Sequence, residues 1–349
     1  MNRLIQIRLK HGEELEEIGG IEIPIRYGSR FNQEIQTLLQ GTGIYDVSSM
    51  MTIQVKGPDA ESFLQGMMSN DVSALKTGGF QPHFICTSRG KIEHRIEMIR
   101  YDEETYWLCC APGEGMDVGR KLDQFHILED LKLSVLNSKI IRIDLIGPKS
   151  GNILKQHGWV LGSFKWIFQK VEIISVQAPI YDHPRWVHLV PVEGAEKFME
   201  SLMQNNDCDL IGKEAFEDFL TYLGYPQFGS DYDCENFPQE TSLGDHISFN
   251  KGCYVGQEPH ARMFHRGHPN WILVKLEIPE IISAYVGMEL YSEDQKVGTI
   301  TSLSKLQKSG FRNGMGMIRY KTASSGHNLF IRDQPNFLIR QKPLPYKIN

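Results

Sequence analysis

The chain of 349 residues lacks several features by which large classes of protein are recognised. It has no apolar run of the roughly 18 residues that a membrane-spanning helix needs, and its first segment, MNRLIQIRLKHGEELEE, has no signal-peptide core. It has no glycine-rich phosphate-binding loop and no internal repeat. Its six cysteines form no CxxC pair, which is typical of reduced thiols rather than of a disulfide framework or a thiolate zinc site. These absences predict a cytoplasmic protein without a membrane partner.

A basic excess is also missing. The 37 Lys and Arg residues are outnumbered by 43 Asp and Glu residues, and the formal net charge is −6. Because nucleic-acid binding generally needs a basic face that displaces counterions, we expect no nucleic-acid partner. Hydrophobic residues make up 41% of the chain, which is enough to build real cores. At roughly 100–200 residues per domain, the length predicts about two or three domains.

The first half of the chain alternates strand and helix patterns irregularly. Residues 51–55 alternate apolar and polar side chains and predict a strand, and residues 58–68 behind it predict a helix. Residues 83–111 predict three strands joined by turns, and residues 113–133 predict a helix and then a strand. This order favours an α+β fold over a doubly wound parallel sheet.

The last part of the chain has a different pattern. From residue 271 onward, short apolar runs alternate with glycine-containing turns, which predicts a small β-barrel or sandwich without a helix. We therefore expect a first α+β module over residues 1–137, a second α+β module over 138–245, and a third module over 246–349 that holds a dense polar loop and the barrel. The first two modules can be interleaved in sequence.

The polar loop is the stretch ISFNKGCYVGQEPHARMFHRGH, residues 247–268. Lys251 in it could meet a ligand carboxylate or be solvated. Cys253 is either a thiol activated by a nearby cation or a small buried hydrophobe, and Tyr254 either stacks on a ring or packs beside a strand. Gly252 and Gly256 are expected to provide a positive φ or a close backbone approach.

Two further sets of side chains near this loop need an assignment. His260, His265 and His268 do not match the usual zinc spacings with Cys253, so we predict no metal site and leave their role open. Upstream, in FPQETSLGDHISF, Glu240 could accept two N–H bonds from an aminopyrimidine-type edge. The alternatives are an exposed loop carboxylate or a charge at a helix N-terminus.

The run SFNKGCYVGQE resembles the signature of the YgfZ-type tetrahydrofolate-binding proteins, Lys-Gly-Cys-(Tyr/Phe)-x-Gly-Gln-Glu. The matching residues are Lys251, Gly252, Cys253, Tyr254, Gly256, Gln257 and Glu258, and the arginine that follows in the family looks like Arg262. GIYDVSSMMTIQVKGPDAESFLQGMMSNDV, FPQETSLGDHISF and VGTITSLSKLQKSG are similar, in the same order, to segments of the related glycine-cleavage T-protein, an aminomethyltransferase. The resemblance covers most of the chain.

This resemblance implies a fold, a cofactor and a function. The fold would be a GcvT/YgfZ-like ring of two ferredoxin-like α+β modules and a C-terminal β-barrel around a central folate cavity. The cofactor would be tetrahydrofolate or another reduced folate. Its binding residues would be Glu240, Lys251, Tyr254, Gln257, Glu258 and Arg262, with Cys253 as the functional thiol. The protein would be an accessory factor in iron–sulfur cluster assembly or repair, with assembly or client proteins as partners. The alternatives are a folate-dependent aminomethyltransferase or demethylase and a folate-binding regulator without chemistry.

One segment departs from the T-protein pattern. T-proteins carry an Asp-Asp pair after a double glycine, whereas SRGKIEHRIEM places His94 and Arg95 there, and an earlier tyrosine is replaced by Pro82. A carboxylate can attract the positive charge that develops on a folate amine or relay its proton, but a guanidinium repels that charge. This departure argues against glycine-cleavage aminomethyl transfer and leaves folate binding in place.

Overall fold

The structure is a computed structural model that describes residues 14–18, 20–28, 30–160, 162–342 and 344. The chain divides into two compact units. The first unit comprises the described residues of 1–64, 72–82 and 96–216, and the second comprises those of 65–71, 83–95 and 217–349. Each unit is considered separately below.

Short strands and helices follow one another along the whole described chain. The first are β1 (Glu14–Ile18), β2 (Ile21–Arg26), α2 (Phe31–Gln40), β3 (Thr42–Asp46), β4 (Thr52–Lys56), α3 (Ala60–Met67), the 3₁₀ turn η1 (Val72–Ala74), β5 (Phe80–Cys86), β6 (Ile92–Arg100), β7 (Thr105–Cys110), α4 (Gly115–Phe125) and β8 (Lys132–Val135). They are followed by β9 (Ile140–Ile146), α5 (Ser150–Gln156), β10 (Lys165–Phe168), β11 (Val171–Gln177), β12 (Arg185–Pro191), α6 (Val192–Met203), β13 (Cys208–Ile211) and α7 (Lys213–Leu223). The last are η2 (Pro238–Glu240), η3 (Gly244–His246), α8 (Gln257–Arg266), β14 (Trp271–Pro279), β15 (Glu289–Ser292), β16 (Gln295–Lys308), β17 (Phe311–Arg319), α9 (Tyr320–Ser325), β18 (Leu329–Ile331) and β19 (Gln334–Lys342).

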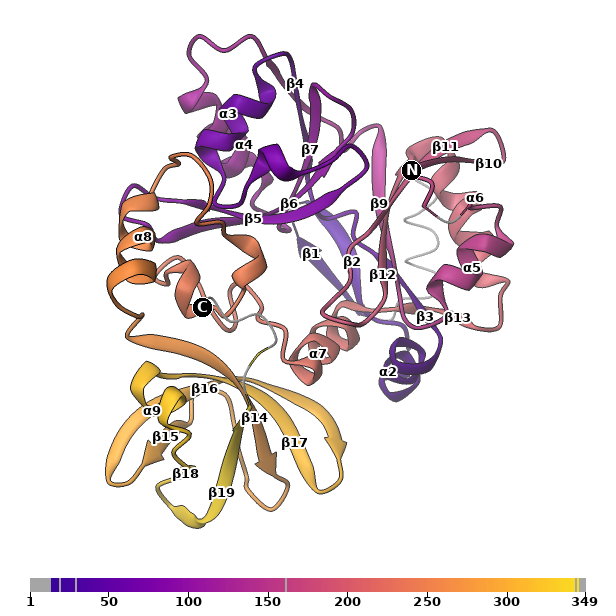
Figure 1. The fold of residues 1–349 in the computed structure, drawn as a ribbon. Coiled ribbons are helices and arrows are strands. Elements are labelled where there is room, and N and C mark those ends of the chain that lie inside the picture. Colours follow the sequence, from indigo (N-terminus) through magenta and orange to yellow (C-terminus); the bar gives the residue numbers. More distant parts are fainter. Residues whose placement is uncertain (1–13, 19, 29, 161, 343, 345–349) are drawn as a thin grey trace. The chain divides into compact units, whose positions relative to one another are not determined.

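A six-stranded sheet in the order β10-β11-β12-β9-β3-β13 forms much of the first unit. Its neighbouring strands are antiparallel except for the parallel pair of β13 and β3. Helices α5 and α6 lie along this sheet (Figure 1). Trp166, Phe168 and Phe198 pack edge-to-face in the core between sheet and helix. This arrangement stabilises the unit through large buried aromatic surfaces.

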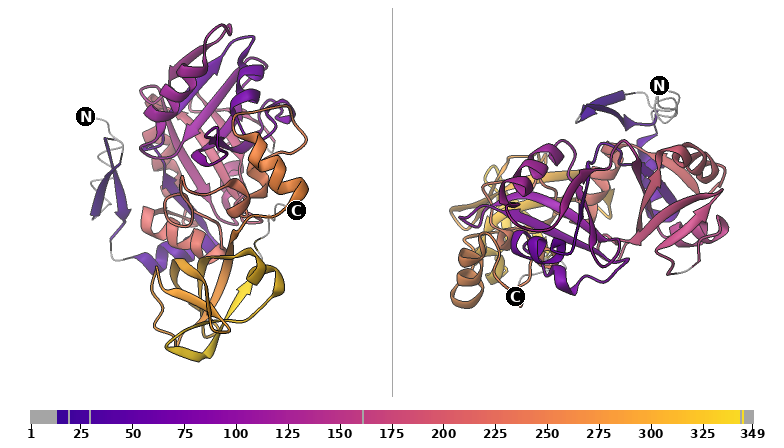
Figure 2. Two further views of the ribbon diagram at one scale, coloured as in Figure 1. Left: turned by 90° about the vertical axis from the view of Figure 1, so that its left-hand side faces the viewer. Right: turned by 90° about the horizontal axis from the view of Figure 1, so that it is seen from above.

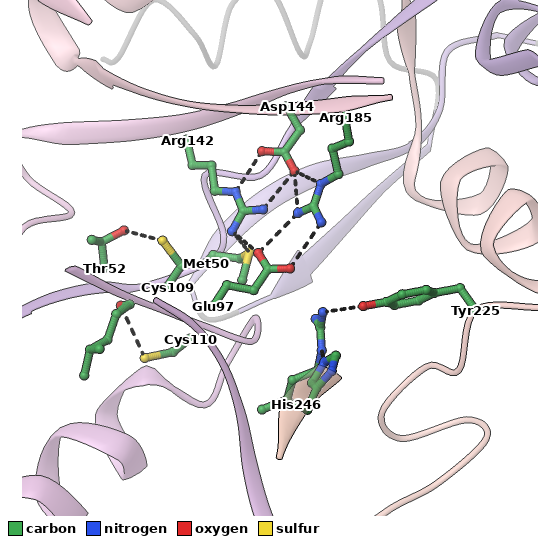
Figure 3. A network of polar contacts seen from close by, with 12 residues as sticks. Met50, Thr52, Glu97, Cys109, Cys110, Arg142, Asp144, Arg185, Tyr225 and His246 are labelled. Atoms are coloured by element: carbon green, nitrogen blue, oxygen red, sulfur yellow. Dashed lines mark hydrogen bonds and ion pairs between the residues drawn. The ribbon is translucent and has the colours of Figure 1, made fainter. Parts of the chain in front are cut away.

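A buried network of charges links three strands of the first unit (Figure 3). Arg142 of β9 lies 2.6 Å from Glu97 of β6 and 2.8 Å from Asp144 of β9. Arg185 of β12 lies 2.8 Å from Asp144 and 3.2 Å from Glu97. Burial alone would raise the pKa of Asp144, but the two guanidinium groups hold it below its ordinary value. Two cations therefore balance two anions in an interior that excludes water.

A five-stranded sheet has the order β5-β6-β7-β4-β8. Every residue of β7, TYWLCC, is buried, which is typical of a strand in the middle of a covered sheet. The predicted strand at residues 51–55 is confirmed as β4, and the predicted helix at 58–68 is confirmed as α3. The expected run of three strands, a helix and a strand is confirmed as β5, β6, β7, α4 and β8. These elements could be predicted because turn residues separate them in the sequence.

The C-terminal part of the second unit is a closed β-barrel in the order β14-β17-β16-β15-β18-β19 (Figure 2). Its core is aliphatic and includes Leu276, Leu290, Ile300, Ile318 and Leu329, which are nearly or completely buried. The predicted barrel and the mixed α+β fold are thus confirmed. The expectation that this part holds no helix is wrong for α9. That helix is six residues long and ends at Gly326, whose φ of 67° stops it before a helical periodicity can show in the sequence.

The compact units do not follow the order of the chain. Strand β3, at residues 42–46, pairs with β9 and β13, so an early segment shares a sheet with residues 140–211. The division into modules at residues 137 and 245 stays a prediction. Within the described ranges, no helix is both long and apolar enough to cross a membrane. The cytoplasmic location expected from the sequence also stays a prediction.

Candidate functional site

The signature loop at residues 251–256 belongs to the second unit and is anchored at its first residue. The Nζ atom of Lys251 donates to the carbonyl oxygens of Gln65, Met68 and Asn70 at 2.8, 2.6 and 2.8 Å. These carbonyls lie in and after the last turn of α3, where helical partners run out. An ammonium group has three donors, and all three are used here. Burial lowers the pKa of Lys251 to about 8, although Asp71 opposes the shift. These three hydrogen bonds fix the start of the loop, so the first role of Lys251 is structural.

The loop ends at Gly256, which is in the left-handed region with a φ of 84° and directly precedes α8. A Cβ atom at this position would lie 2.4 Å from the carbonyl oxygen of Thr87 and 3.1 Å from Cα of Gly90. Only glycine fits such a close backbone approach. The predicted role is confirmed for Gly256. It is wrong for Gly252, whose φ is not left-handed and whose Cβ would meet nothing within 4 Å.

Tyr254 and His260 join the loop, α8 and a neighbouring turn. The Tyr254 hydroxyl lies 2.8 Å from Nδ1 of His260, and Nε2 of His260 lies 2.6 Å from the carbonyl oxygen of Gly90. A carbonyl only accepts, so Nε2 carries the hydrogen and Nδ1 accepts from the tyrosine. Burial lowers the pKa of His260 against the opposing effect of the Gly90 carbonyl, which keeps the ring neutral. Sequence spacing leaves the role of His260 open, and the structure shows that His260 forms a buried bridge.

Cys253 is exposed. In the sequence it lies between Lys251, with its three hydrogen bonds, and the bridge of Tyr254 and His260. The alternative that it is a small buried hydrophobe is therefore wrong. Cys234 is another exposed free thiol of the described chain, whereas Cys86, Cys109 and Cys110 are buried. Burial raises the pKa of the Cys109 and Cys110 thiols and suppresses their reactivity. The loop thus presents the Cys253 thiol to solvent on a backbone held on both sides.

The remaining signature residues lie on α8 beyond the loop. Gln257 is half-buried in the first turn, and Glu258 and Arg262 are exposed. Of the other histidines, His265 packs edge-to-face on Phe264 and His268 stacks on Tyr320. The described residues contain no group of three or more His, Cys, Asp or Glu side chains that could hold a metal ion.

Glu240 is 6% exposed and closes a short 3₁₀ turn. Its Oε2 atom accepts from the backbone N–H of Phe237 and from Nδ2 of Asn236, both at 3.0 Å. The alternative of an exposed loop carboxylate is wrong, and the alternative of a helix N-terminal charge is confirmed in the form of a 3₁₀ cap. A folate contact by Glu240 stays a prediction.

A second polar cluster surrounds Arg95, where the resemblance to the T-protein predicts an acid; its partners His246 and Tyr225 are labelled in Figure 3. Arg95 donates through Nε to Nε2 of His246 at 3.2 Å and through Nη2 to the hydroxyl of Tyr225 at 3.0 Å. Nδ1 of His246 lies 2.8 Å from Oδ1 of Asp245, so this nitrogen carries the ring hydrogen. Burial would raise the pKa of Asp245, but the hydrogen bond from His246 holds it lower. A fixed cation, not a carboxylate, therefore occupies this position.

No pattern in the sequence indicates these partners. Asp245 and His246 lie in the short turn η3, and Tyr225 follows α7, so no periodicity connects any of them to Arg95. His94, the neighbour of Arg95 on β6, is buried at 8% exposure. Only the departure from the T-protein pattern at 94–95 pointed to this region.

His83 of β5 is the most unusual buried group of the second unit. Its side chain is fully buried, and neither ring nitrogen has a hydrogen-bond partner among the described residues. Burial, together with the charge of Lys251, lowers its pKa well below the ordinary value, so the ring is neutral. A neutral imidazole offers one donor and one acceptor. Leaving such groups unsatisfied costs roughly 1–3 kcal/mol each, so their presence calls for a partner.

Comparison with known proteins establishes first the class of fold. The glycine cleavage system aminomethyltransferase T from Bartonella henselae matches with a TM-score of 0.85 over 98% of this chain and 96% of that chain, at 19% sequence identity. The protein therefore has an aminomethyltransferase T fold. The model of the GCVT N-terminal domain matches residues 4–180, and the chain belongs to this family.

Two relatives show how far the similarity extends. An aminomethyltransferase of Desulforamulus reducens is 26% identical over 356 residues, which cover 99% of this chain and 95% of that protein. An aminomethyltransferase of Bacillus mycoides is 30% identical over 153 residues, which cover 44% of this chain and 41% of that protein. The resemblance to the T-protein is thus confirmed at the level of the family, and the narrower YgfZ-type kinship stays a prediction.

Proposed function

We propose that this protein binds tetrahydrofolate and handles a folate-borne one-carbon group, as a member of the aminomethyltransferase type. The observation that carries this proposal is the alignment with the Desulforamulus reducens aminomethyltransferase over 99% of this chain and 95% of that protein. Similarity of that extent includes every part of the chain that could contribute to a folate site. It favours the transferase alternative over the accessory function in iron–sulfur cluster assembly.

His83 supports the fit of a reduced folate to this chain. A pterin ring carries both N–H donors and acceptors, which are the partners that a neutral imidazole needs. His83 provides one donor and one acceptor without a partner in the described protein. When bound, tetrahydrofolate supplies the amine nitrogens that carry a one-carbon unit.

The residues expected from the signature belong to the same proposal. Lys251 and Tyr254 hold the shape of the loop through their buried hydrogen bonds. Glu240 offers a carboxylate to the pterin edge. Gln257, Glu258 and Arg262 lie together on α8, where Arg262 is the cation that suits the glutamate tail of a folate.

A second candidate function is the YgfZ-type accessory role in iron–sulfur cluster assembly or repair. Two features favour it: the Cys253 thiol is exposed on a loop that is held at both ends, and Arg95 stands where the resemblance to the T-protein predicts an acid. In this role the protein would still bind a reduced folate, and Cys253 would act on a partner or client protein.

Isothermal titration calorimetry with tetrahydrofolate and its polyglutamate form tests the proposal of folate binding. We expect saturable binding to the wild type and a loss of about 1–3 kcal/mol in the Glu240→Gln variant, because a charge-assisted contact would be removed. Equal affinity of the variant and the wild type for tetrahydrofolate would show that Glu240 does not contact the ligand. Absence of binding to the wild type would remove both candidate functions.

Two assays separate the candidate functions. Steady turnover of a methylated amine with tetrahydrofolate supports the transferase. Loss of iron–sulfur enzyme activity in a deletion strain carrying Cys253→Ala, with full activity for Cys234→Ala, supports the accessory role. Cys234 is the matched control because its thiol is also free and exposed.

A further inference from the structure

A small groove lies in the second unit between the end of α8, the start of β14 and the start of α9. Its lining includes Gln239, Met263, Gly267, His268, Ile272 and Tyr320. It encloses about 80 Å³, far less than the roughly 300–1,000 Å³ of sites for drug-sized ligands. The groove therefore has room for a single small ring and no more.

Two aromatic side chains, His268 and Tyr320, belong to the lining of the groove. The rings of His268 and Tyr320 are stacked, with centroids 4.4 Å apart and an interplanar angle of 9°. The backbone N–H of Tyr320 donates to the carbonyl oxygen of Asn270 at 2.9 Å, which ties this part of the lining to the turn before β14. Met263 and Ile272 add a thioether and an aliphatic surface. Such a lining favours a planar ring that can stack.

Gln239, whose side chain is 4% exposed, adds an amide to the lining of the groove. Its Nε2 atom donates to the carbonyl oxygen of His260 at 3.2 Å. Because a carbonyl cannot donate, this bond fixes the orientation of the amide and assigns the oxygen to the other side. That oxygen, Oε1, is buried and has no hydrogen-bond partner among the described residues. An acceptor left in this state favours a ligand that brings an N–H donor.

We propose that this groove binds a single planar aromatic ring carrying an amide or ring N–H donor. The ring stacks beside His268 and Tyr320, and its N–H donates to Oε1 of Gln239. The site is separate from the proposed folate site, and neither Glu240 nor the Cys253 loop contributes to its lining.

Ligand-observed NMR titration of the full chain with nicotinamide tests this proposal. Nicotinamide has one ring and an amide donor, and we expect a dissociation constant on the order of 1–10 mM for a ligand of this size. Nicotinate is the matched ligand because its carboxylate would turn an acceptor toward Oε1, and it should bind about tenfold or more weakly. Equal binding of the two ligands, or no binding of nicotinamide, would overturn the proposal.

Two variants place the ligand in the groove. A Cβ at Gly267 meets nothing within 4 Å, and its φ of −167° is ordinary extended backbone, so Gly267→Leu adds a bulky side chain to the lining of the groove without straining the fold. We expect this variant to melt as the wild type does, lose nicotinamide binding and keep tetrahydrofolate binding. Gln239→Met should weaken nicotinamide about three- to tenfold through the lost acceptor. Unchanged nicotinamide binding in a folded Gly267→Leu variant, or loss of tetrahydrofolate with it, would refute a separate site.

Discussion

At the scale of single residues, the polar side chains inside the second unit differ in how far the protein satisfies them. Lys251 uses all three donors, and His260 uses both ring nitrogens. Neither ring nitrogen of His83 has a hydrogen-bond partner in the part of the chain that the structure describes. A buried group with partners stabilises the fold, whereas one without partners destabilises it until a ligand or water satisfies it. This contrast separates residues that hold the site from a residue that is available to a ligand.

Replacement of His83 by leucine should stabilise the ligand-free protein. Removing two unsatisfied nitrogens is expected to raise the free energy of unfolding by about 1–2 kcal/mol at pH 7.5. The pKa of His83 is depressed in the folded state, so below pH 6.5 the unfolded chain binds a proton that the folded chain does not. Wild-type stability should therefore fall further than that of the variant as the pH decreases below 6.5, by up to about 1.4 kcal/mol per pH unit.

Urea denaturation of both proteins between pH 7.5 and 5 measures this difference. The other buried histidines are common to both proteins and cancel in the comparison. A His83→Leu variant that is less stable than the wild type at every pH would show that His83 has a partner. If His83 contacts the pterin, the same variant also loses affinity for tetrahydrofolate.

Replacement of Tyr254 by phenylalanine removes one hydroxyl and leaves Nδ1 of His260 without a donor. The free energy of unfolding should fall by about 1–2 kcal/mol, since that nitrogen stays buried. His265→Ala is the control because His265 is exposed, and its effect should stay within about 0.5 kcal/mol. Equal effects of the two substitutions in urea denaturation would contradict the bridge.

At the scale of elements, the signature loop is defined by its two ends. The end of α3 receives the Lys251 ammonium, and the start of α8 needs the left-handed Gly256. The signature could be read from the sequence because its residues are contiguous. Its long-range partners could not, since they come from residues 65–70 and 87–90, far away in the chain.

The Gly256→Ala substitution tests the end of the loop. The new Cβ would lie 2.4 Å from the Thr87 carbonyl oxygen in a conformation that disfavours side chains. We expect a loss of at least about 2 kcal/mol of unfolding free energy. Gly252→Ala, at an open position, should change stability by no more than about 0.5 kcal/mol. Thermal or urea denaturation of the pair gives the comparison, and a tolerated Gly256→Ala would disprove the close approach.

The charge network between β6, β9 and β12 makes a prediction for the first unit. Arg142→Met leaves Glu97 and Asp144 with one guanidinium between them, so unfolding free energy should fall by about 3–5 kcal/mol. The double variant Arg142→Met/Glu97→Met keeps the Arg185–Asp144 pair and restores charge balance. It should therefore recover part of the loss. If the unfolding free energy of the single variant lay within about 1 kcal/mol of the wild-type value, charge balance in the network would not be needed for stability.

At the scale of the whole molecule, the order of strands and helices in the first half and the C-terminal barrel could be predicted. Their turns and periodicities are local features, as in residues 83–111. The pairing of β3 with β9 and β13 could not be predicted, because it depends on contacts between segments about 100 residues or more apart. The orphan state of His83 and the cluster around Arg95 also arise only from three-dimensional packing. Family membership explains the shared fold. The hypothesis that the protein binds a folate gives the site residues a common role.

Titration of tetrahydrofolate into the wild-type protein, followed by calorimetry, tests that claim most directly. We expect a saturable heat with one binding site per chain, and a weaker isotherm for His83→Leu in a protein that is folded and more stable. A wild-type titration that shows no heat beyond dilution at high protein concentration would contradict it.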